Sequence, residues 1–353
     1  MQRGIIGLGM WCVDTTYKID NLPERGKLEP ISNTFQCVGG GPSNVLTNLN
    51  SLGFKHPMYA MGSIGLDTDA SIIKKHCREN KIETKYLIVS KQISTSHTVC
   101  MFEKQKERTF LYYPGANSLL DKKHFKINQL KTAPKVLYVG YITLLGKLDK
   151  FDVDKKTRLS KVLKKAKSKN VITVLDLVSN KHPKYKNIIE SSLPFTDYLL
   201  LNEIEAEILF NRKIYDFNKK LNQKTLTKLI GKVFKKGIIK GVVIHSPTES
   251  LYFDRSKKIY TRSKVLPKSR VINSVGAGDA FCAAFIFGIH ENWDIKKTLK
   301  KAHSAGTSMM KVNASSEIYL IYLNYNFKTF SVISTSFKSF LSGMSLFFFN
   351  SEW

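Results

Sequence analysis

The feature that most constrains the fold of this chain is the alternation of short apolar runs with helix-like segments. The apolar runs are GIIGLGM, HTVCMFEK, RTFLYYPG, KVLYVGYI, VITVLDLV, DYLLLN and GVVIHSP. The helix-like segments between several of them include PSNVLTNLNSLG, TRLSKVLKKAKSK and EIEAEILF. Apolar strands that alternate with helices form mostly parallel sheets whose two faces are both covered. The sequence therefore predicts an α/β fold, a three-layer α/β/α sandwich with a mostly parallel central sheet.

Two stretches depart from this alternation. Residues 15–37 and 97–113 alternate apolar with polar side chains, and the second stretch reverses direction at KQKE. Such alternation is typical of hairpin strands with one face exposed to solvent. We therefore expect lid strands at about residues 13–37 and 95–113. They would form a small β-sheet lid, separate from the main sheet, that covers a cleft.

The segment VINSVGAGDAFCAAFIFGI, residues 271–289, places a glycine-rich turn between the strand-like run RVINS and an apolar helix. A turn of this kind leaves several backbone N–H groups unpaired and directs them, together with the helix dipole, at one point. Such a point binds phosphate or stabilises charge on a phosphoryl group during transfer. The glycines Gly276 and Gly278 also allow a ligand to approach the backbone closely.

Asp279, in the first turn of this predicted helix, has two possible roles. An acidic side chain there is ordinarily a capping residue, which stabilises a helix by about 0.5–2 kcal/mol. Beside an anion-binding turn, however, a capping carboxylate would repel the phosphate. A carboxylate at this position is better suited to accept a proton from an attacking hydroxyl group, so we favour a general base.

The stretch NSVGAGDAF (273–281) resembles the second signature of the ribokinase-like carbohydrate kinases, also called the PfkB family. Three further segments resemble motifs of this family and occur in the family's order. They are CVGGGPSNVLTNLNSLG (37–53), GSIGLDTDA (62–70) and DYLLLNEIEAEIL (197–209). The resemblance covers about residues 4–316 and implies a ribokinase-like sandwich with a small lid.

The resemblance implies roles for the residues that match these motifs. Asp279 would be the general base, with Gly276, Ala277 and Gly278 forming an anion hole for the transferred phosphoryl group. The sugar would contact Asp14, Gly39, Gly40, Gly41, Asn44 and Arg108. Asn44 offers both a donor and an acceptor, although an early-turn cap would also explain it. A solvated hairpin arginine would equally explain Arg108.

On the nucleotide side, Asn202 and Glu205 are three residues apart and lie on one side of a first helical turn. Their oxygens would hold hydrated Mg²⁺ beside the ATP phosphates, although Asn followed by Glu three residues later is also a helix N-cap pattern. The predicted ATP contacts are Asn202, Glu205, His245, Ser246, Ser274, Gly276 and Gly278. Where the family commonly carries Thr-x-Gly-x-x-Gly, this chain reads HSPTES (245–250), which alters the nucleotide edge of the site.

The basic composition does not by itself indicate a function. Lys and Arg total 56 against 28 Asp and Glu, which gives a formal net charge of +28. The lysines are dispersed over helix-like stretches such as KKTRLSKVLKKAKSKN, as expected for solvated helix faces. Charge alone supports only salt-sensitive, nonspecific association with polyanions, and no RNA-binding motif accompanies it. We therefore expect no specific nucleic-acid partner.

The cysteines and the N-terminus favour a cytoplasmic location. The five cysteines have no C-x-x-C spacing, so they indicate neither a disulfide framework nor a zinc site. The N-terminal MQRGIIGLGMW lacks the apolar core and cleavage site of a signal peptide and reads as a first strand. We expect no membrane span.

The end of the chain departs from the family pattern. We expect a PfkB-type kinase domain over residues 1–316 and an atypical tail over residues 317–353, which is rich in aromatic residues and serine. The tail has no clean apolar run of about 18 residues, so it is a poor transmembrane helix. Our hypothesis is that the tail is non-homologous, arising from a change of reading frame, and leaves the family's monovalent-ion site incomplete.

The sequence therefore predicts an ATP-dependent kinase that phosphorylates a hydroxyl group of a sugar or related polyol, with Mg²⁺ as a cofactor. The resemblance further implies, as hypotheses, a K⁺ site and a homodimer formed through the lid. A nucleoside kinase of the adenosine type remains an alternative because it shares all of these motifs. A non-catalytic ligand-binding member of the family fits less well, because Asp279 and the anion-binding turn are both kept.

Overall fold

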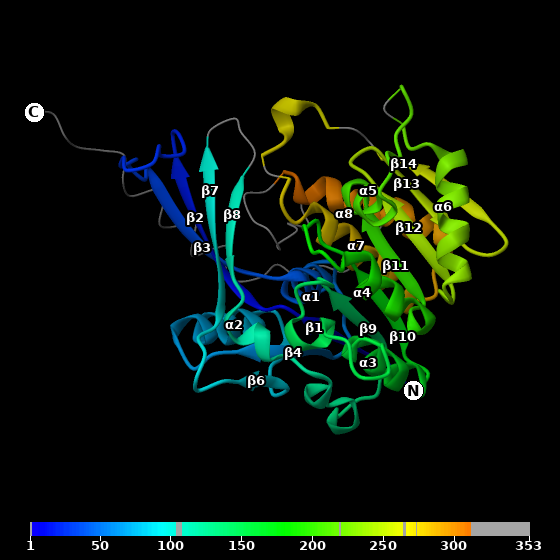
Figure 1. The fold of residues 1–353 in the computed structure, drawn as a ribbon, viewed down its shortest axis with the longest axis horizontal. Helices are drawn as coiled ribbons and strands as arrows, with labels where there is room; N and C mark the ends of the chain where they lie inside the picture. The colour runs from blue at the N-terminus through cyan, green and yellow to red at the C-terminus, as the bar shows by residue number, and fades with distance from the viewer. Residues whose placement is uncertain (1, 104–107, 219, 264–265, 273, 312–353) are drawn as a thin grey trace, which may run out of the picture. The chain divides into compact units, whose positions relative to one another are not determined.

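A ten-stranded sheet lies at the centre of the structure (Figure 1), a computed structural model that describes residues 2–103, 108–218, 220–263, 266–272 and 274–311. Its strands are β1 (Gly4–Gly9), β4 (Met58–Ile64), β5 (Ile82–Glu83), β6 (Leu87–Val89), β9 (Pro134–Gly140), β10 (Ile172–Asp176), β11 (Tyr198–Asn202), β12 (Gly241–His245), β13 (Glu249–Phe253) and β14 (Lys258–Arg262). They follow the order β14-β13-β12-β11-β10-β9-β1-β4-β5, and β6 pairs with β4.

The main sheet is parallel from β12 to β5, as the sequence predicts. Only β13 and β14 are antiparallel to their neighbours, and they form one edge. Strands β1 and β4 are buried at every position. Burial on both faces explains why these strands read as continuous apolar runs without alternation.

Helices cover both faces of the main sheet. They are α1 (Gly41–Ser51), α2 (Thr68–Glu79), α3 (Arg158–Lys167), α4 (Tyr185–Ser192), α5 (Glu203–Phe210), α6 (Gln223–Lys235), α7 (Ala277–His290) and α8 (Ile295–Met309). The short 3₁₀ helices are η1 (Gly115–Leu119), η2 (Lys122–His124), η3 (Ile127–Gln129), η4 (Gly146–Asp149), η5 (Leu193–Phe195) and η6 (Lys268–Arg270).

The helices belong to two hydrophobic cores, one on each face of the sheet. Side chains of α3, α4, α5 and α6 pack with Ile6 and Leu8 of β1, whereas side chains of α1, α2, α7 and α8 pack with Ile5 of the same strand. Successive residues of a strand point to opposite faces, so the two cores form separate layers. This arrangement confirms the predicted three-layer sandwich.

A second, four-stranded sheet stands apart from the main sheet in the order β3-β2-β7-β8 (Figure 1). Its strands are β2 (Cys12–Ile19), β3 (Asn33–Gly39), β7 (Ser96–Glu103) and β8 (Thr109–Tyr113). β2 runs antiparallel to β3 and parallel to β7, and β7 runs antiparallel to β8. These bounds confirm a small second sheet in the two predicted stretches, while the predicted turn at KQKE lies outside the described residues.

Some local predictions were wrong or incomplete. The run RVINS is not a strand, because η6 ends at Arg270 and the described residues that follow it are irregular. Ile272 is 60% exposed, and its N–H is bonded to the carbonyl oxygen of Met310 at the end of α8 instead of to a sheet. The strand β4 and the β13–β14 hairpin were not predicted; the small residues of β4 have low strand propensity.

The described residues all belong to one compact unit. Within the ranges described, no helix has the length and apolar character needed to cross a membrane. The predicted tail over residues 317–353 and the residue Asn273 of the signature lie outside the described residues.

Candidate active site

The carboxyl ends of four neighbouring parallel strands meet at one edge of the main sheet. There β10 ends at Asp176, β11 at Asn202 and β12 at His245, and Tyr141 directly follows the last residue of β9. In open α/β sheets, ligands bind in the crevice outside the carboxyl ends of the strands. The candidate site lies at this edge.

The GAGD turn leads directly into α7, as the sequence predicts. Gly276 is the N-cap residue and has a φ of 80°, a left-handed conformation that favours glycine. Ala277 and Gly278 begin the helix and line a cavity. The first amide groups of a helix have no partner within the helix. The N–H of Ala277 makes only a long turn bond, 3.4 Å to the carbonyl oxygen of Ser274, so the turn can present backbone N–H donors at the cavity wall.

Asp279 is held by two side chains, one from the residue that follows β9 and one from α1. The hydroxyl group of Tyr141 donates to its Oδ1 and Oδ2 at 2.8 and 2.9 Å, and Asn44 Nδ2 donates to its Oδ2 at 2.9 Å. Burial raises the pKa of Asp279 to about 6, the two hydrogen bonds oppose this rise, and the charge of Asp14 adds to it. The carboxylate is thus ionised near neutral pH and still able to take up a proton, which favours a base over a cap.

Asn44 lies in the first turn of α1 and has an unused acceptor. Its Nδ2 donates to Asp279, whereas its Oδ1 is buried without a hydrogen-bond partner among the described residues. The N-cap of α1 is Gly40, with a φ of 94°, so Asn44 does not cap the helix. A buried acceptor without a partner costs ~1–3 kcal/mol. Oδ1 is therefore suited to accept a hydrogen bond from a ligand hydroxyl group.

The glycines before α1 bring the site's own side chains close to the backbone. A Cβ atom at Gly39 would lie 2.0 Å from Asp14 Oδ2, and a Cβ atom at Gly41 would lie 2.8 Å from the hydroxyl oxygen of Tyr138. Side chains other than hydrogen would collide with these groups. The sequence suggested that the glycines make room for a sugar; the structure shows that they also make room for Asp14 and Tyr138.

Asp14 extends the site into the small sheet, where it lies in β2. Burial raises its pKa, whereas hydrogen bonds from Thr98 and Cys12 and the charge of Arg108 lower it. Arg108 itself lies over the ring of Phe102, with 5.0 Å between the guanidinium carbon and the ring centroid. The structure therefore brings Asp14 towards Asp279, and it places the positive charge of Arg108 within electrostatic reach of Asp14.

Two further buried carboxylates stand beside Asp279. Tyr138 donates its hydroxyl hydrogen to Asp176 Oδ2 at 2.8 Å, and burial together with the charges of Glu205 and Asp279 raises the pKa of Asp176. Burial also raises the pKa of Glu205, to about 7. The charge of Asp279 contributes to the raised pKa of both Asp176 and Glu205, so the three acidic groups form a centre that a cation would stabilise.

Asn202 and Glu205 form the helix cap that was one of their two predicted roles. Asn202 Oδ1 accepts from the N–H of Glu205 at 2.9 Å, and Glu205 Oε2 accepts from the N–H of Asn202 at 2.8 Å. Within the described part of the chain, neither Glu205 nor Asp176 forms an ion pair with a lysine or arginine. Their hard, negatively charged oxygens fit a hydrated Mg²⁺, so the cap and the metal role are compatible.

A cavity of about 180 Å³ lies between the β12–β13 turn, the GAGD turn and α8. The predicted residues that line it are Asn202, His245, Ser246, Ser274, Ala277 and Gly278. Pockets for drug-sized ligands typically measure ~300–1,000 Å³. The cavity therefore has room for part of a nucleotide without further opening.

His245 and Ser246 shape this cavity without adding charge to it. The ring of His245 stacks on Phe281 with 4.5 Å between centroids, and burial lowers the pKa of His245 to about 3. Ser246 Oγ accepts from the N–H of Glu249 at 3.2 Å inside the β12–β13 turn. The HSPTES segment thus forms a tight turn between β12 and β13, and Pro247 and Ser250 stand where the family commonly has glycines.

The sequence did not single out Tyr141, Asp176, Phe281 or His303 as site residues. His303 lines the cavity, and its Nε2 lies 3.0 Å from Ser250 Oγ. One signal was available for Asp176, because an acidic residue that ends an apolar strand of a parallel sheet lies at the ligand-binding edge. The other three lie in ordinary apolar or helical patterns.

Comparison with known proteins identifies the family of this chain. A family model described as pfkB family carbohydrate kinase matches residues 7–317. A ribokinase of Arabidopsis thaliana is 23% identical over 318 residues, which cover 88% of this chain and 77% of that protein. A 5-dehydro-2-deoxygluconokinase of Shouchella clausii is 24% identical over 325 residues, which cover 90% of this chain and 92% of that protein.

A solved structure has a similar fold. The structure of Arabidopsis thaliana ribokinase complexed with ribose and ATP superimposes on this chain with a TM-score of 0.73 at 18% sequence identity. The match covers 92% of this chain and 100% of the ribokinase chain. It confirms the predicted ribokinase-like fold.

Proposed function

This chain belongs to the pfkB family of carbohydrate kinases, and we propose that it transfers the γ-phosphoryl group of ATP to a hydroxyl group of a sugar or related polyol. As a carbohydrate kinase it is a phosphotransferase with an alcohol group as acceptor. The observation that carries the finer proposal is Asp279, a buried carboxylate held by Tyr141 and Asn44 next to the exposed end of a helix. The ribose and ATP bound to the Arabidopsis ribokinase support the choice of both substrates.

Asp279 acts as the general base. Its pKa of about 6 leaves the carboxylate ionised near neutral pH, so it accepts the proton of the attacking hydroxyl group. The hydroxyl oxygen then forms a bond to the γ-phosphorus, the bond between that phosphorus and the bridging oxygen breaks, and ADP leaves. Tyr141 and Asn44 donate to the carboxylate from fixed positions and keep it oriented towards the substrate.

The first turn of α7 stabilises the transferred group. The N–H groups of Ala277 and Gly278 lie at the helix terminus, where the dipole favours negative charge. Because they are backbone groups fixed before the substrate binds, they need no reorganisation as charge develops on the phosphoryl oxygens. Gly276 is required here because its left-handed φ of 80° directs the chain into the helix.

Glu205, Asp176 and Asn202 would hold Mg²⁺ through water molecules. Bound there, the ion would neutralise phosphate charge and stabilise the ionised forms of Glu205 and Asp176, whose pKa is raised by burial and further by neighbouring acidic groups. Asn202 contributes an amide oxygen while it continues to cap α5.

The sugar occupies the space between the small sheet and the GAGD turn. Asp14 and the unpaired Oδ1 of Asn44 accept hydrogen bonds from its hydroxyl groups, and Gly39 leaves room for the Asp14 carboxylate. Closure of the small sheet over the substrate would exclude water and so prevent hydrolysis of ATP.

A phosphorylation screen tests this proposal. Purified protein is incubated with ATP, Mg²⁺ and a panel of pentoses, hexoses, sugar acids, sugar phosphates and nucleosides, and both ADP and phosphorylated product are measured. We expect at least one sugar or polyol to be phosphorylated in a one-to-one ratio with ADP. Phosphorylation of nucleosides alone would replace the proposal by a nucleoside kinase. Ligand-induced thermal shifts without ATP consumption would replace it by a non-catalytic binding protein.

A further inference from the structure

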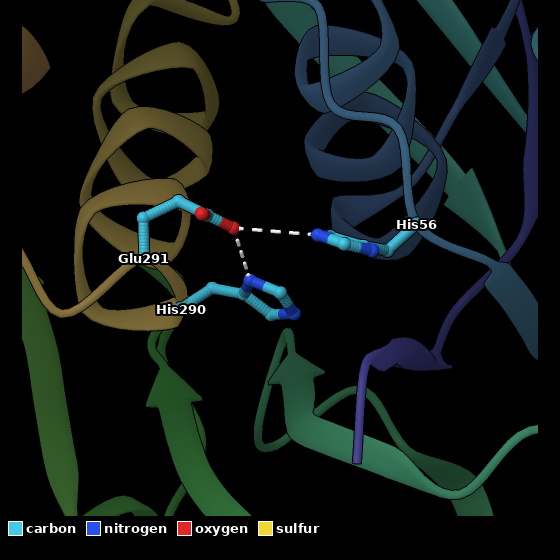
Figure 2. A group of neighbouring side chains, drawn as sticks. All are labelled: His56, His290 and Glu291. Carbon is cyan, nitrogen blue, oxygen red and sulfur yellow. Dashed lines mark hydrogen bonds and ion pairs between the residues drawn. The ribbon is translucent and has the colours of Figure 1, made fainter. Parts of the chain in front are cut away.

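Three side chains that can bind transition metals lie close together near the C-terminal ends of α1 and α7, and Figure 2 shows them as sticks. His56 lies between α1 and β4, His290 is the last residue of α7, and Glu291 is its C-cap residue. One donor atom of each lies within 4.8 Å of the other two. None of the three takes part in the proposed phosphoryl transfer.

His290 has the hydrogen-bond pattern of a metal ligand. Its Nε2 lies 2.7 Å from the carbonyl oxygen of Arg3, which can only accept, so Nε2 carries the proton and donates it. Metal-binding histidines almost always donate their second ring N–H to a carbonyl or carboxylate group, which fixes the tautomer and the ring orientation. The remaining nitrogen, Nδ1, lies 2.6 Å from Glu291 Oε1, a contact that is favourable only with a proton or a metal ion between the two atoms.

His56 completes the cluster from a separate part of the chain. Its Nε2 lies 3.6 Å from the same Oε1 atom of Glu291 (Figure 2). The rings of His56 and His290 lie 4.9 Å apart, and Phe54 packs edge-on against both, at 5.3 and 4.8 Å. This packing holds both imidazole rings in place without a metal.

The donor atoms lie close to the spacing of ligands around a tetrahedral ion, and the cluster is open to solvent. Zinc binds nitrogen and oxygen at ~2.0–2.2 Å in tetrahedral geometry, so its ligand atoms lie ~3.3 Å from one another. The separations of 2.6 and 3.6 Å that involve Glu291 lie on either side of this value, and all three donor atoms lie within 4.8 Å of one another, so small side-chain rotations would be needed to bind the ion. The side chains of His56 and Glu291 are 31% and 36% exposed, so water can reach a fourth position.

We propose that His56, His290 and Glu291 form a zinc-binding site with water as the fourth ligand. Two imidazoles, one carboxylate and an open position form a ligand set typical of zinc. The ion would join the α1–β4 connection to the end of α7 and, through Arg3, to the start of the chain. The opposite ends of α1 and α7 carry Asn44 and Asp279, so the ion fixes the two helices that position the candidate base.

The positive charge of Lys135 is expected to weaken zinc binding at this site. Its Nζ donates to the carbonyl oxygen of His290 and, at 3.5 Å, to Asn292 Oδ1. The positive charge stays next to the cluster and opposes a second cation. In addition, zinc must separate His290 from Glu291, which contact each other when no ion is bound. The site therefore binds zinc reversibly, unlike a closed four-ligand structural site.

The test measures metal binding to the chain without an affinity tag, in the presence of excess Mg²⁺. Co²⁺ serves as a spectroscopic probe because tetrahedral Co²⁺ absorbs strongly in the visible range, and Zn²⁺ binding is measured by calorimetry. We expect one site per chain, and the variants His56→Gln and Glu291→Gln to weaken its affinity by at least ~10-fold. The matched control His182→Gln removes a histidine outside the cluster and leaves the affinity unchanged.

Thermal unfolding supplies a second readout. Zinc at ~100 times its dissociation constant should raise the unfolding midpoint of the wild-type chain by ~5 °C, and that of His56→Gln by much less. Both substitutions replace partly exposed side chains, so the variants should fold. The proposal is overturned if the wild-type chain shows no tetrahedral Co²⁺ spectrum, or if His56→Gln and Glu291→Gln bind zinc as tightly as His182→Gln.

Discussion

Replacing Asp279 with asparagine should make the protein more stable above neutral pH. Asp279 is buried, and its pKa rises from 3.8 in the unfolded chain to about 6 in the folded one. A carboxyl group with a raised pKa contributes its full stability below pH 3.8, and that contribution is lost as the pH rises through 6. At pH 8 the folded wild-type chain therefore carries the cost of an ionised, buried carboxylate, which Asp279→Asn removes.

The size of this effect follows from the shift in pKa. A shift of about two units corresponds to ~3 kcal/mol of unfolding free energy above pH 7 and to less than ~1 kcal/mol at pH 4. The asparagine keeps an acceptor for the hydroxyl group of Tyr141. Asn44 can then turn its unpaired Oδ1 towards the new amide, but this turn moves its Nδ2 donors into the buried position where Oδ1 had no partner. The cost of these unpaired donors offsets part of the gain to a similar extent at every pH.

Urea unfolding of Asp279→Asn and wild type at pH 8 and pH 4 measures this difference. We expect the variant to be more stable than wild type at pH 8, by less than the full ~3 kcal/mol, and no more stable than wild type at pH 4. As a control, Asp121→Asn removes a carboxylate that pairs with Arg158 at 2.7 Å and should lower stability at pH 8. The reasoning is refuted if Asp279→Asn is no more stable than wild type at pH 8, or if its gain is the same at both pH values.

Three other substitutions test single parts of the site. Tyr141→Phe removes a hydrogen bond that lowers the pKa of the candidate base, so the acidic limb of the kcat/KM profile should move to higher pH. Gly39→Ala places a Cβ atom 2.0 Å from Asp14 Oδ2 and should raise KM for the sugar at least ~10-fold, whereas Gly231→Ala, with open space around it, should leave KM unchanged. Glu205→Gln keeps the helix cap but removes a carboxylate from the cation site, so the concentration of Mg²⁺ needed for half-maximal activity should rise.

The architecture could be predicted from the sequence because it depends on local periodicity. The strand β1 is buried at every position, whereas β7 alternates buried with more exposed positions over residues 96–100, and this difference separates the main sheet from the small one. The prediction of a strand at RVINS was wrong because it also rested on local pattern. Two adjacent apolar residues in an exposed connection look the same in the sequence as part of a short strand. The segment HSPTES gave no clear sign of the turn that it forms between β12 and β13.

The candidate site could be predicted only where several special residues are close together in the sequence. The GAGD turn has its glycines and its carboxylate within four consecutive positions, so its chemistry is visible locally. Tyr141 contacts Asp279 across a separation of 138 residues, and nothing beside Tyr141 marks it as a site residue. His56 and His290 are likewise brought together only by the packing of α1 against α7.

The measurement that tests the central claim most directly is the turnover number of Asp279→Asn with ATP and a sugar that the wild-type chain phosphorylates. If Asp279 is the general base, kcat should fall by ~10²–10⁴-fold or more while the dissociation constant of the sugar stays nearly unchanged. Asp121→Asn, measured alongside, should keep the wild-type turnover number. An Asp279→Asn variant with ordinary turnover would contradict the assignment of the base.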